Sequence, residues 1–263
     1  MGKARDGVQE SVLQYTRGLN RFGGGMKHIL AGLGFTLLAT PAFAIDAWPQ
    51  CNSPERNAKT LWACNQVIAH GWMANTIAAA TYENRARTHL TLGHFDSAVT
   101  DATSALKMLP EPGKETGEDV KFVKLASELR VQSFATRAAA HRKKSENDLA
   151  DSDAAQSLTL ANQLITANPS GQNYWLRAWA SHEMAKDTEA LPDATKAVEA
   201  AEDPSSALRL RATIEEALGR KEDAVADYRA ALKLLMALKH PNQFETTYIW
   251  FNVQALQRLG EKL

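Results

Sequence analysis

Residues 79–112 read AATYENRARTHLTLGHFDSAVTDATSALKMLPEP, and the skeleton of this stretch occurs twice more in the chain. The two further copies, 171–204 and 205–238, have the same length of 34 residues and directly abut one another. A repeat of this length in helix-forming sequence indicates stacked helix–turn–helix units. Alanine is frequent here and β-branched residues are sparse, which also favours helix.

Small side chains recur where two antiparallel helices must approach closely. One position on the first helix of each copy and two on the second are always alanine. These residues are Ala86, Ala178 and Ala212, then Ala98, Ala190 and Ala224, then Ala105, Ala197 and Ala231. The pattern predicts that each copy is a tightly packed helical hairpin.

Residues that begin and end helices fall at matching places in the copies. Gly93 and Gly219 lie where the first helix should end and the chain should turn in the left-handed conformation. Asp96 and Asp223 are placed to cap the second helix. Asp203-Pro204 indicates a further helix start at a boundary between copies.

These residues resemble the tetratricopeptide repeat family, whose motif places a large residue, a small one, Gly, aromatic residues, Ala-Leu and Pro at set positions. The first copy matches through Tyr82, Ala86, Gly93, Phe95, Ala98, Ala105, Leu106 and Pro110. The last copy matches through Ala212, Gly219, Ala224, Tyr228, Ala231, Leu232 and Leu234. The middle copy matches through Tyr174, Ala178, Ala190 and Ala197. It has Ala185 in place of Gly, and Pro192 predicts that its second helix begins late or bends.

A degenerate unit is predicted in residues 120–170, after a loop rich in Pro and Gly. It keeps Phe134, Arg137, Ala138, His141, Ala161, Leu164, Ile165 and Pro169. We expect it to carry an insertion around 145–150. A last amphipathic helix within 242–263 is expected to cap the array. From Cys51 onwards the resemblance implies an all-α, right-handed superhelical solenoid of antiparallel helix pairs.

The N-terminal part resembles an export signal. A basic head at Met26-Lys27-His28 precedes an apolar run, and the stretch ends at Ala44 in an Ala-x-Ala pattern. This order predicts a signal peptide over 26–44, cleaved after Ala44. The run is shorter than the roughly 20 apolar residues that span a bilayer. We therefore expect a periplasmic or secreted protein without a stable membrane anchor after cleavage. Residues 1–25 are either an over-extended start before Met26 or a long n-region.

The chain contains two cysteines, Cys51 and Cys64. An even count in an exported chain favours a disulfide. The alternatives are half of a metal site or a catalytic thiol, and neither has the accompanying His and Cys spacing. A helix is predicted over 57–69, so the disulfide would fix the preceding segment to this helix within an N-terminal part, 45–78.

An arginine precedes an aspartate by 16 residues in each of the three copies. The pairs are Arg85 with Asp101, Arg177 with Asp193, and Arg211 with Asp227. In a helical hairpin this spacing can bring the two side chains together across the pair. Since the pattern recurs once in every copy, we interpret it as a set of structural ion pairs rather than as catalytic groups.

Repeat arrays of this family present a concave groove lined by one face of the first helices. The family register places candidate binding residues there: Glu83, Asn84, Arg87, Arg142, Trp175, Trp179, His182 and Arg209. Trp175 and Trp179 are four residues apart and share a helical face. Aromatic and Arg side chains are typical of interface centres. The alternative for both tryptophans is packing against the neighbouring helix.

Motifs of catalysis and of cofactor binding are missing from the sequence. The seven His residues do not cluster with metal-ligand spacing, and no nucleophile or phosphate-loop pattern occurs. Thirty basic against 30 acidic residues give no basic surface for nucleic acid. We expect a non-enzymatic protein that binds a protein or peptide partner without a cofactor or metal. The alternatives are an assembly scaffold of an envelope complex and, less favoured, a hydrolase of envelope polymers.

Overall fold

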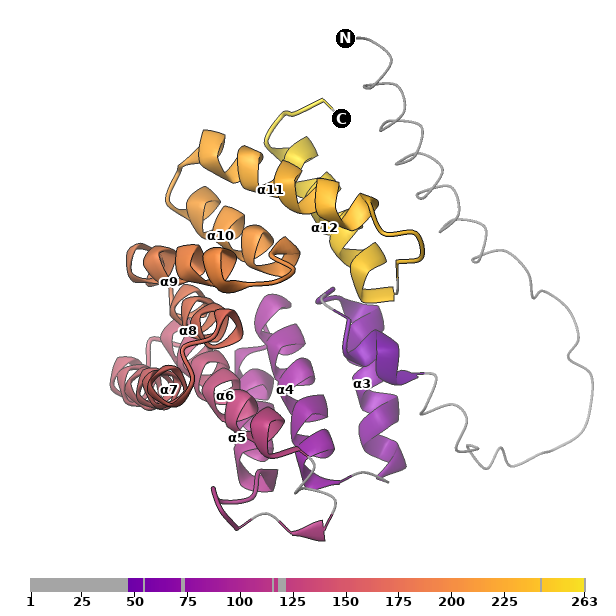
Figure 1. Ribbon diagram of the computed structural model, residues 1–263. Helices are drawn as coiled ribbons and strands as arrows, with labels where there is room; N and C mark the ends of the chain where they lie inside the picture. The colour runs from indigo at the N-terminus through magenta and orange to yellow at the C-terminus, as the bar shows by residue number, and fades with distance from the viewer. Residues whose placement is uncertain are drawn as a thin grey trace, which may run out of the picture.

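The computed structural model describes residues 47–53, 55–71, 74–114, 116–117, 122–241 and 243–262, apart from the side chains of 243 and 244. All regular structure in these ranges is helical (Figure 1). A short helical segment at 47–51 precedes the longer helices. These are α3 (Ala58–His70), α4 (Asn75–Thr91), α5 (Phe95–Met108), α6 (Val123–Lys143), α7 (Asn147–Ala167), α8 (Gly171–Glu183), α9 (Asp187–Ala200), α10 (Ser205–Ala217), α11 (Lys221–Met236) and α12 (Gln243–Arg258). The predicted extension 1–25 and signal peptide 26–44 lie outside the described residues.

The helices pack as successive hairpins, α4–α5, α6–α7, α8–α9 and α10–α11. The first helices also contact one another in order, α4 with α6, α6 with α8, and α8 with α10. Each second helix packs on the first helix of the next hairpin. Two further helices cover the ends, α3 against α4 and α12 against α11 (Figure 1). This arrangement confirms the predicted all-α architecture of adjacent helix pairs.

Alanine lines the contact between the two helices of each hairpin. The equivalent residues are fully buried: Ala86, Ala138, Ala178 and Ala212 on the first helices, and Ala98, Ala150, Ala190 and Ala224 on the second. Because a methyl group occupies little space, the two backbones can approach closely while the interior stays densely packed. The predicted role of these positions is confirmed.

The four hairpin turns are each three residues long and share one backbone conformation. The middle residue has a positive φ in every turn, 79° at Gly93, 64° at Ser145, 57° at Ala185 and 73° at Gly219. The left-handed turn predicted for the two glycines is confirmed. Ser145 and Ala185 adopt it despite a Cβ atom, which costs roughly 1 kcal/mol per residue.

Two predictions about helix lengths are wrong. The degenerate unit has no insertion at 145–150, because its turn equals the others and α6 and α7 are each 21 residues long. Its additional residues extend the helices instead. Of the two alternatives predicted from Pro192, the late start is wrong, because α9 begins at Asp187 and contains the proline, and the bend stays a prediction.

The predicted capping roles of Asp96 and Asp223 are also wrong. The N-cap residues of α5 and α11 are His94 and Arg220, and neither helix has a side-chain cap hydrogen bond. Both aspartates lie in the first helical turn, where a carboxylate still interacts favourably with the helix dipole. At α10 the carboxylate of Asp203 does accept a hydrogen bond, 2.9 Å long, from the backbone N–H of Ser205.

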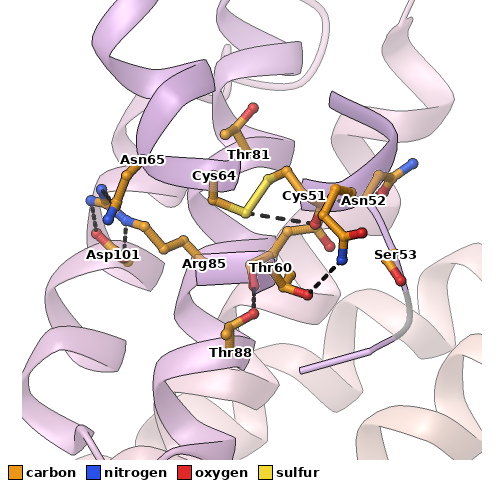
Figure 2. Close-up of a disulfide and its surroundings, with 12 residues drawn as sticks. Cys51, Asn52, Ser53, Thr60, Cys64, Asn65, Thr81, Arg85, Thr88 and Asp101 are labelled. Carbon is orange, nitrogen blue, oxygen red and sulfur yellow. Dashed lines mark hydrogen bonds and ion pairs between the residues drawn. A yellow bond between two sulfur atoms is a disulfide. The ribbon is translucent and has the colours of Figure 1, made fainter. Parts of the chain in front are cut away.

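The predicted disulfide between Cys51 and Cys64 is present, with a Cα–Cα distance of 4.7 Å and both residues fully buried. It joins the 47–53 segment to α3 (Figure 2). The same segment reaches α4, where the Asn84 side-chain amide donates to Asn52 Oδ1 over 3.0 Å. Closing a loop of this length stabilises the fold by about 3 kcal/mol in the chain-entropy model.

Each hairpin contains one bidentate Arg–Asp ion pair. In every pair the Arg Nε and Nη2 atoms donate to the two carboxylate oxygens, over 2.5 to 2.8 Å. We call the set Arg85–Asp101, Arg137–Asp153, Arg177–Asp193 and Arg211–Asp227 the ion-pair ladder. The second of these pairs was missed in the sequence because the supposed insertion concealed its spacing of 16 residues.

Three arginines of the ladder also bond to the element before their own hairpin. Arg85 Nη1 donates to Asn65 Oδ1 of α3 over 2.9 Å (Figure 2). Arg137 Nη1 donates to Thr103 Oγ1 of α5 over 3.1 Å. A third such bond joins Arg177 on α8 to Asn162 on α7. Each of these guanidinium groups therefore connects three helices.

Candidate functional site

Side chains from distant parts of the chain meet on the layer of first helices. Arg87 of α4 lies over the Trp179 ring of α8, with 4.5 Å from Cζ to the ring centroid. Its Nη2 atom is 3.8 Å from Glu183 Oε1 at the end of α8. Because the α6–α7 hairpin separates α4 from α8 in the array, these contacts mean that the layer of first helices curves inward. We define the central cluster as Arg56, Glu83, Arg87, Trp179, Glu183, Arg209 and Tyr248.

Glu83 forms the buried base of the central cluster and is 1% exposed. Its Oε1 atom accepts a 2.7 Å hydrogen bond from the Thr136 hydroxyl of α6. Its Oε2 atom has no hydrogen-bond partner within the described part of the chain. Burial raises the pKa of Glu83 to about 7, although the Thr136 hydrogen bond and the charge of Arg87 act in the opposite direction. The carboxyl group therefore changes its charge near neutral pH.

Arg56 belongs to the cluster and lies in the segment between Cys51 and the start of α3. Its guanidinium donates to the backbone oxygen of Ser53 over 2.5 Å and to Asn84 Oδ1 over 3.3 Å. Its Nε atom is buried and has no hydrogen-bond partner among the described residues. Burial, and next the positive charge of Arg87, lower the pKa of Arg56 to about 9. Arg56 is therefore still charged at neutral pH, although burial and the neighbouring charge of Arg87 disfavour the charged form.

Arg209 and Tyr248 complete the cluster from α10 and α12. The Arg209 Cζ atom lies 4.8 Å from the Tyr248 ring centroid, and the buried Nε atom has no hydrogen-bond partner in the described ranges. Burial lowers the pKa of Arg209, while Tyr248 and Tyr228 act in the opposite direction. Tyr248 also interacts electrostatically with Arg56. Residues that precede the first repeat and residues that follow the last one therefore meet here, and Figure 1 shows α3 and α12 on the same side of the molecule.

The central cluster contains half of the candidate residues proposed from the sequence: Glu83, Arg87, Trp179 and Arg209. Trp175 adjoins it, since its ring stacks on that of Trp179 at a centroid distance of 6.4 Å and an interplanar angle of 9°. The indole Nε1 of Trp175 is buried without a hydrogen-bond partner in the described structure.

Of the other three candidates, Asn84 contacts the cluster through Arg56, and two form their contacts outside it. Asn84 is bonded to the N-terminal segment through Asn52 and Arg56. The structure brings neither Arg142 nor His182 into the cluster. Arg142 Nη2 pairs with Asp151 Oδ1 of α7 over 3.0 Å, and His182 Nδ1 bonds to Asp187 at the α8–α9 turn.

Burial divides the cluster into a base and a rim. Glu83 and Trp179 are buried, at 1% and 4% exposure, rather than open to a groove as the family register suggests. Arg87 and Glu183 each keep 24% of their side chains exposed. Arg56, Arg209 and Tyr248 are also partly exposed. The rim therefore consists of Arg56, Arg87, Arg209, Tyr248 and Glu183, and Glu83 and Trp179 lie beneath it.

The repeat pattern could not reveal two members of the cluster. Arg56 precedes the first repeat and Tyr248 follows the last one, so neither occupies a repeated position. The one local indication is that Arg56 lies within the loop closed by the disulfide. Their meeting depends on the curvature of the whole array.

The described residues contain no group of three or more His, Cys, Asp or Glu side chains arranged to hold a metal ion. Within the same ranges, no helix has the length and apolar character needed to cross a membrane. Chemically, the rim offers planar hydrogen-bond donors with positive charge beside aromatic rings, which suits an anionic group. No protein-family model matches the chain, and no curated protein matches it at a significant level of similarity.

Proposed function

We propose that the protein is an exported member of the tetratricopeptide repeat type that binds a segment of a partner protein on its curved inner face. In this proposal the helix pairs form a right-handed superhelical solenoid, and the central cluster is the centre of the binding surface. Function would take place in the periplasm or outside the cell, without catalysis and without a cofactor.

One observation carries the proposal. Arg56, Arg87, Arg209 and Tyr248 come from four separate elements, yet their partly exposed side chains meet at one place. Buried polar atoms that lack partners within the described chain lie beside them, on Arg56, Arg209 and Glu83. An unpaired buried polar group costs about 1–3 kcal/mol, so a ligand that pairs with these atoms would gain free energy on binding. Arg beside aromatic rings is also the composition of interface hot spots.

A second function, an assembly scaffold that uses its outer surface, is favoured by a different observation. Large apolar side chains are exposed away from the central cluster, with Trp62 of α3 at 58%, Leu149 of α7 at 54% and Trp250 of α12 at 37% exposure. Trp62 and Trp250 lie on the two end helices and Leu149 on an inner hairpin, and exposed apolar groups of this kind are suited to contact with other subunits.

Site-specific photo-crosslinking can separate the two functions. A crosslinking amino acid is introduced at Glu183 on the cluster rim, at Trp62 on the outer face of α3, or at Gln163 on exposed α7 as the control. If the partner binds at the central cluster, position 183 should give one discrete crosslinked partner, and positions 62 and 163 should give none. A partner crosslinked from position 62 alone would support the scaffold function. The same crosslinked proteins from all three positions would refute a specific site.

A further inference from the structure

The backbone of the first hairpin turn brings together two histidines that are five positions apart in the sequence. Gly93 has a φ of 79°, and the backbone N–H of His94 donates to the backbone oxygen of His89 over 2.8 Å. This is the Schellman arrangement of a helix end, in which the donating and the accepting residue lie side by side. Apolar side chains frequently fill these two positions, whereas here both carry an imidazole ring.

The two imidazole rings face each other through the same nitrogen atom. His89 Nδ1 lies 3.2 Å from His94 Nδ1, and the ring centroids are 5.4 Å apart. Without an ion, this distance allows a hydrogen bond from one ring to the other. Two imidazole nitrogens that bind one tetrahedral metal ion at about 2.0–2.1 Å are held about 3.3 Å apart, so the pair is already close to the spacing of two metal ligands. Because His94 is exposed, an ion from solvent can reach the pair.

A buried carboxylate lies beside the other nitrogen of His89. His89 Nε2 is 3.7 Å from Asp101 Oδ2, and Asp101 is itself fixed by its bidentate pair with Arg85. A carboxylate beside one ring nitrogen favours the tautomer that carries the proton there, which leaves a lone pair on the other nitrogen. Burial lowers the pKa of His89, although Asp101 acts in the opposite direction, so the neutral ring that binds metals is the main form at neutral pH.

The second hairpin has the same arrangement with a different residue after the turn. His141 Nε2 lies 3.9 Å from Asp153 Oδ2 of the ladder, and His141 Nδ1 is 2.6 Å from Glu146 Oε2. Glu146 is also paired with Lys144 over 2.7 Å. The histidine of the second hairpin therefore has an acidic partner, whereas His89 faces a second ring nitrogen. A cation between the two rings would play the part in the first turn that the carboxylate plays in the second.

We propose that His89 and His94 form a binding site for a divalent transition-metal ion at the first hairpin turn, with water in the remaining coordination positions. Imidazole nitrogen is a ligand of Zn²⁺, Ni²⁺ and Cu²⁺, and Cu²⁺ binds most tightly of the three to a given site. The described ranges contain no group of three or more His, Cys, Asp or Glu side chains that could hold a metal, so the protein supplies two ligands.

The sequence alone predicted no metal site, because residues five apart do not share a face of one helix. The turn between the helices, rather than a helical face, brings the two rings together. Neither His89 nor His94 belongs to the central cluster, so this inference goes beyond the proposed function and does not depend on it.

Titration of the full, untagged chain with Cu²⁺ tests the site. Isothermal titration calorimetry at neutral pH gives the affinity, with Zn²⁺ and Mg²⁺ titrated in parallel. We expect saturable binding of Cu²⁺, weaker binding of Zn²⁺ and none of Mg²⁺, which prefers oxygen ligands. His94→Gln should weaken Cu²⁺ binding about tenfold or more, since even the loss of a group that orients a ligand costs about tenfold. His240→Gln is the matched control, because His240 is also exposed and follows α11.

Electron paramagnetic resonance of the bound Cu²⁺ identifies its ligands. The wild-type complex should show coupling to two imidazole nitrogens, and the His89→Gln and His94→Gln complexes to one at most. Circular dichroism melting curves identify any variant that fails to fold, and His94→Gln then decides the outcome because His94 is exposed in the turn.

Two results overturn the site. One is Cu²⁺ binding whose affinity is unchanged in His94→Gln, which places the ion elsewhere, and the other is the absence of saturable Cu²⁺ binding to the wild-type chain. Loss of Cu²⁺ binding in His94→Gln but not in His240→Gln supports the site. None of these results depends on the crosslinking experiment at Glu183, so the metal site and the proposed function can fail separately.

Discussion

The ion-pair ladder and the central cluster use the same guanidinium group in opposite ways. Every arginine of the ladder donates two hydrogen bonds to an aspartate whose side chain is between 4% and 11% exposed. In the central cluster, Arg56 and Arg209 keep a buried Nε atom without any partner in the described structure. Satisfied pairs of this kind hold a fold together, whereas unsatisfied buried groups cost free energy. The difference is consistent with a stabilising role for the ladder and with the proposal that the cluster binds a partner.

The largest predicted effect breaks one rung of the ladder. Arg137→Ala leaves Asp153, 6% exposed, as a buried carboxylate without its partner, and should lower the free energy of unfolding by about 4 kcal/mol. Arg87→Gln in the cluster should change it by less than about 1 kcal/mol, since its contact with Glu183 is long and partly exposed. Urea denaturation followed by circular dichroism measures both. Equal losses in the two variants would remove the distinction between ladder and cluster.

Removal of the disulfide should affect the cluster more than the ladder. The double variant Cys51→Ser, Cys64→Ser should lose about 3 kcal/mol of stability, because its unfolded state is no longer constrained. It should also bind the proposed partner segment more weakly, since Arg56 is then less firmly held. Hydrogen exchange should show lost protection in α3 and retained protection in α8 to α11, because repeats interact chiefly with their neighbours. Uniform loss across all helices would contradict this expectation.

Glu83 should make stability depend on pH. Its folded-state pKa of about 7 lies above the ordinary 4.5, so the folded protein binds this proton more tightly than the unfolded chain. The resulting contribution, up to about 3 kcal/mol, is fully present below pH 4.5 and is lost as the pH rises through 7. Glu83→Gln should remove this part of the dependence of the free energy of unfolding on pH. Urea denaturation of the wild-type protein and of Glu83→Gln between pH 4.5 and 8 gives the free energy of unfolding of each at every pH. If the two proteins show the same dependence on pH, Glu83 is excluded as its source.

The smallest predicted effect concerns the turns that connect the ladder pairs. Ala185→Gly should raise the free energy of unfolding by about 1 kcal/mol, because Ala185 has a φ of 57° that glycine adopts without strain. Gly219→Ala should lower it by a similar amount, and a Cβ atom there would meet no atom within 4 Å, so only backbone strain contributes. Thermal melting of the two variants provides the measurement. If both substitutions changed the free energy of unfolding in the same direction, backbone strain at the positive φ would not be its cause.

Local patterns in the sequence were enough to predict the hairpins. Spacing within the repeat identified the ion pair of Arg85 with Asp101 and the buried alanines, because the two helices of a hairpin are close in sequence. The disulfide was predicted because the chain has only two cysteines. The same logic failed at Asp96 and Asp223, which lie two and three residues after the N-cap residues of their helices. It also failed at Asp153, because an assumed insertion shifted the alignment.

The candidate binding surface was only partly predictable for a different physical reason. Family register placed Arg87 and Trp179 on one face, but their burial depends on how strongly the whole array curves. Arg56 and Tyr248 join them from outside the repeats, so their contribution follows from long-range packing that no periodic pattern encodes. Residues that belong to no repeat are therefore the ones that distinguish this surface from that of a generic array.

The bonds from the ladder arginines to the preceding element also imply an order of assembly. Asn65, Thr103 and Asn162 each lie earlier in the chain than the arginine that donates to them. When the chain folds from its N-terminus, each of the first three hairpins thus finds its acceptor already in place. The disulfide-bonded segment and α3 supply the first acceptor, so the N-terminal end can act as the template on which the hairpins add one after another.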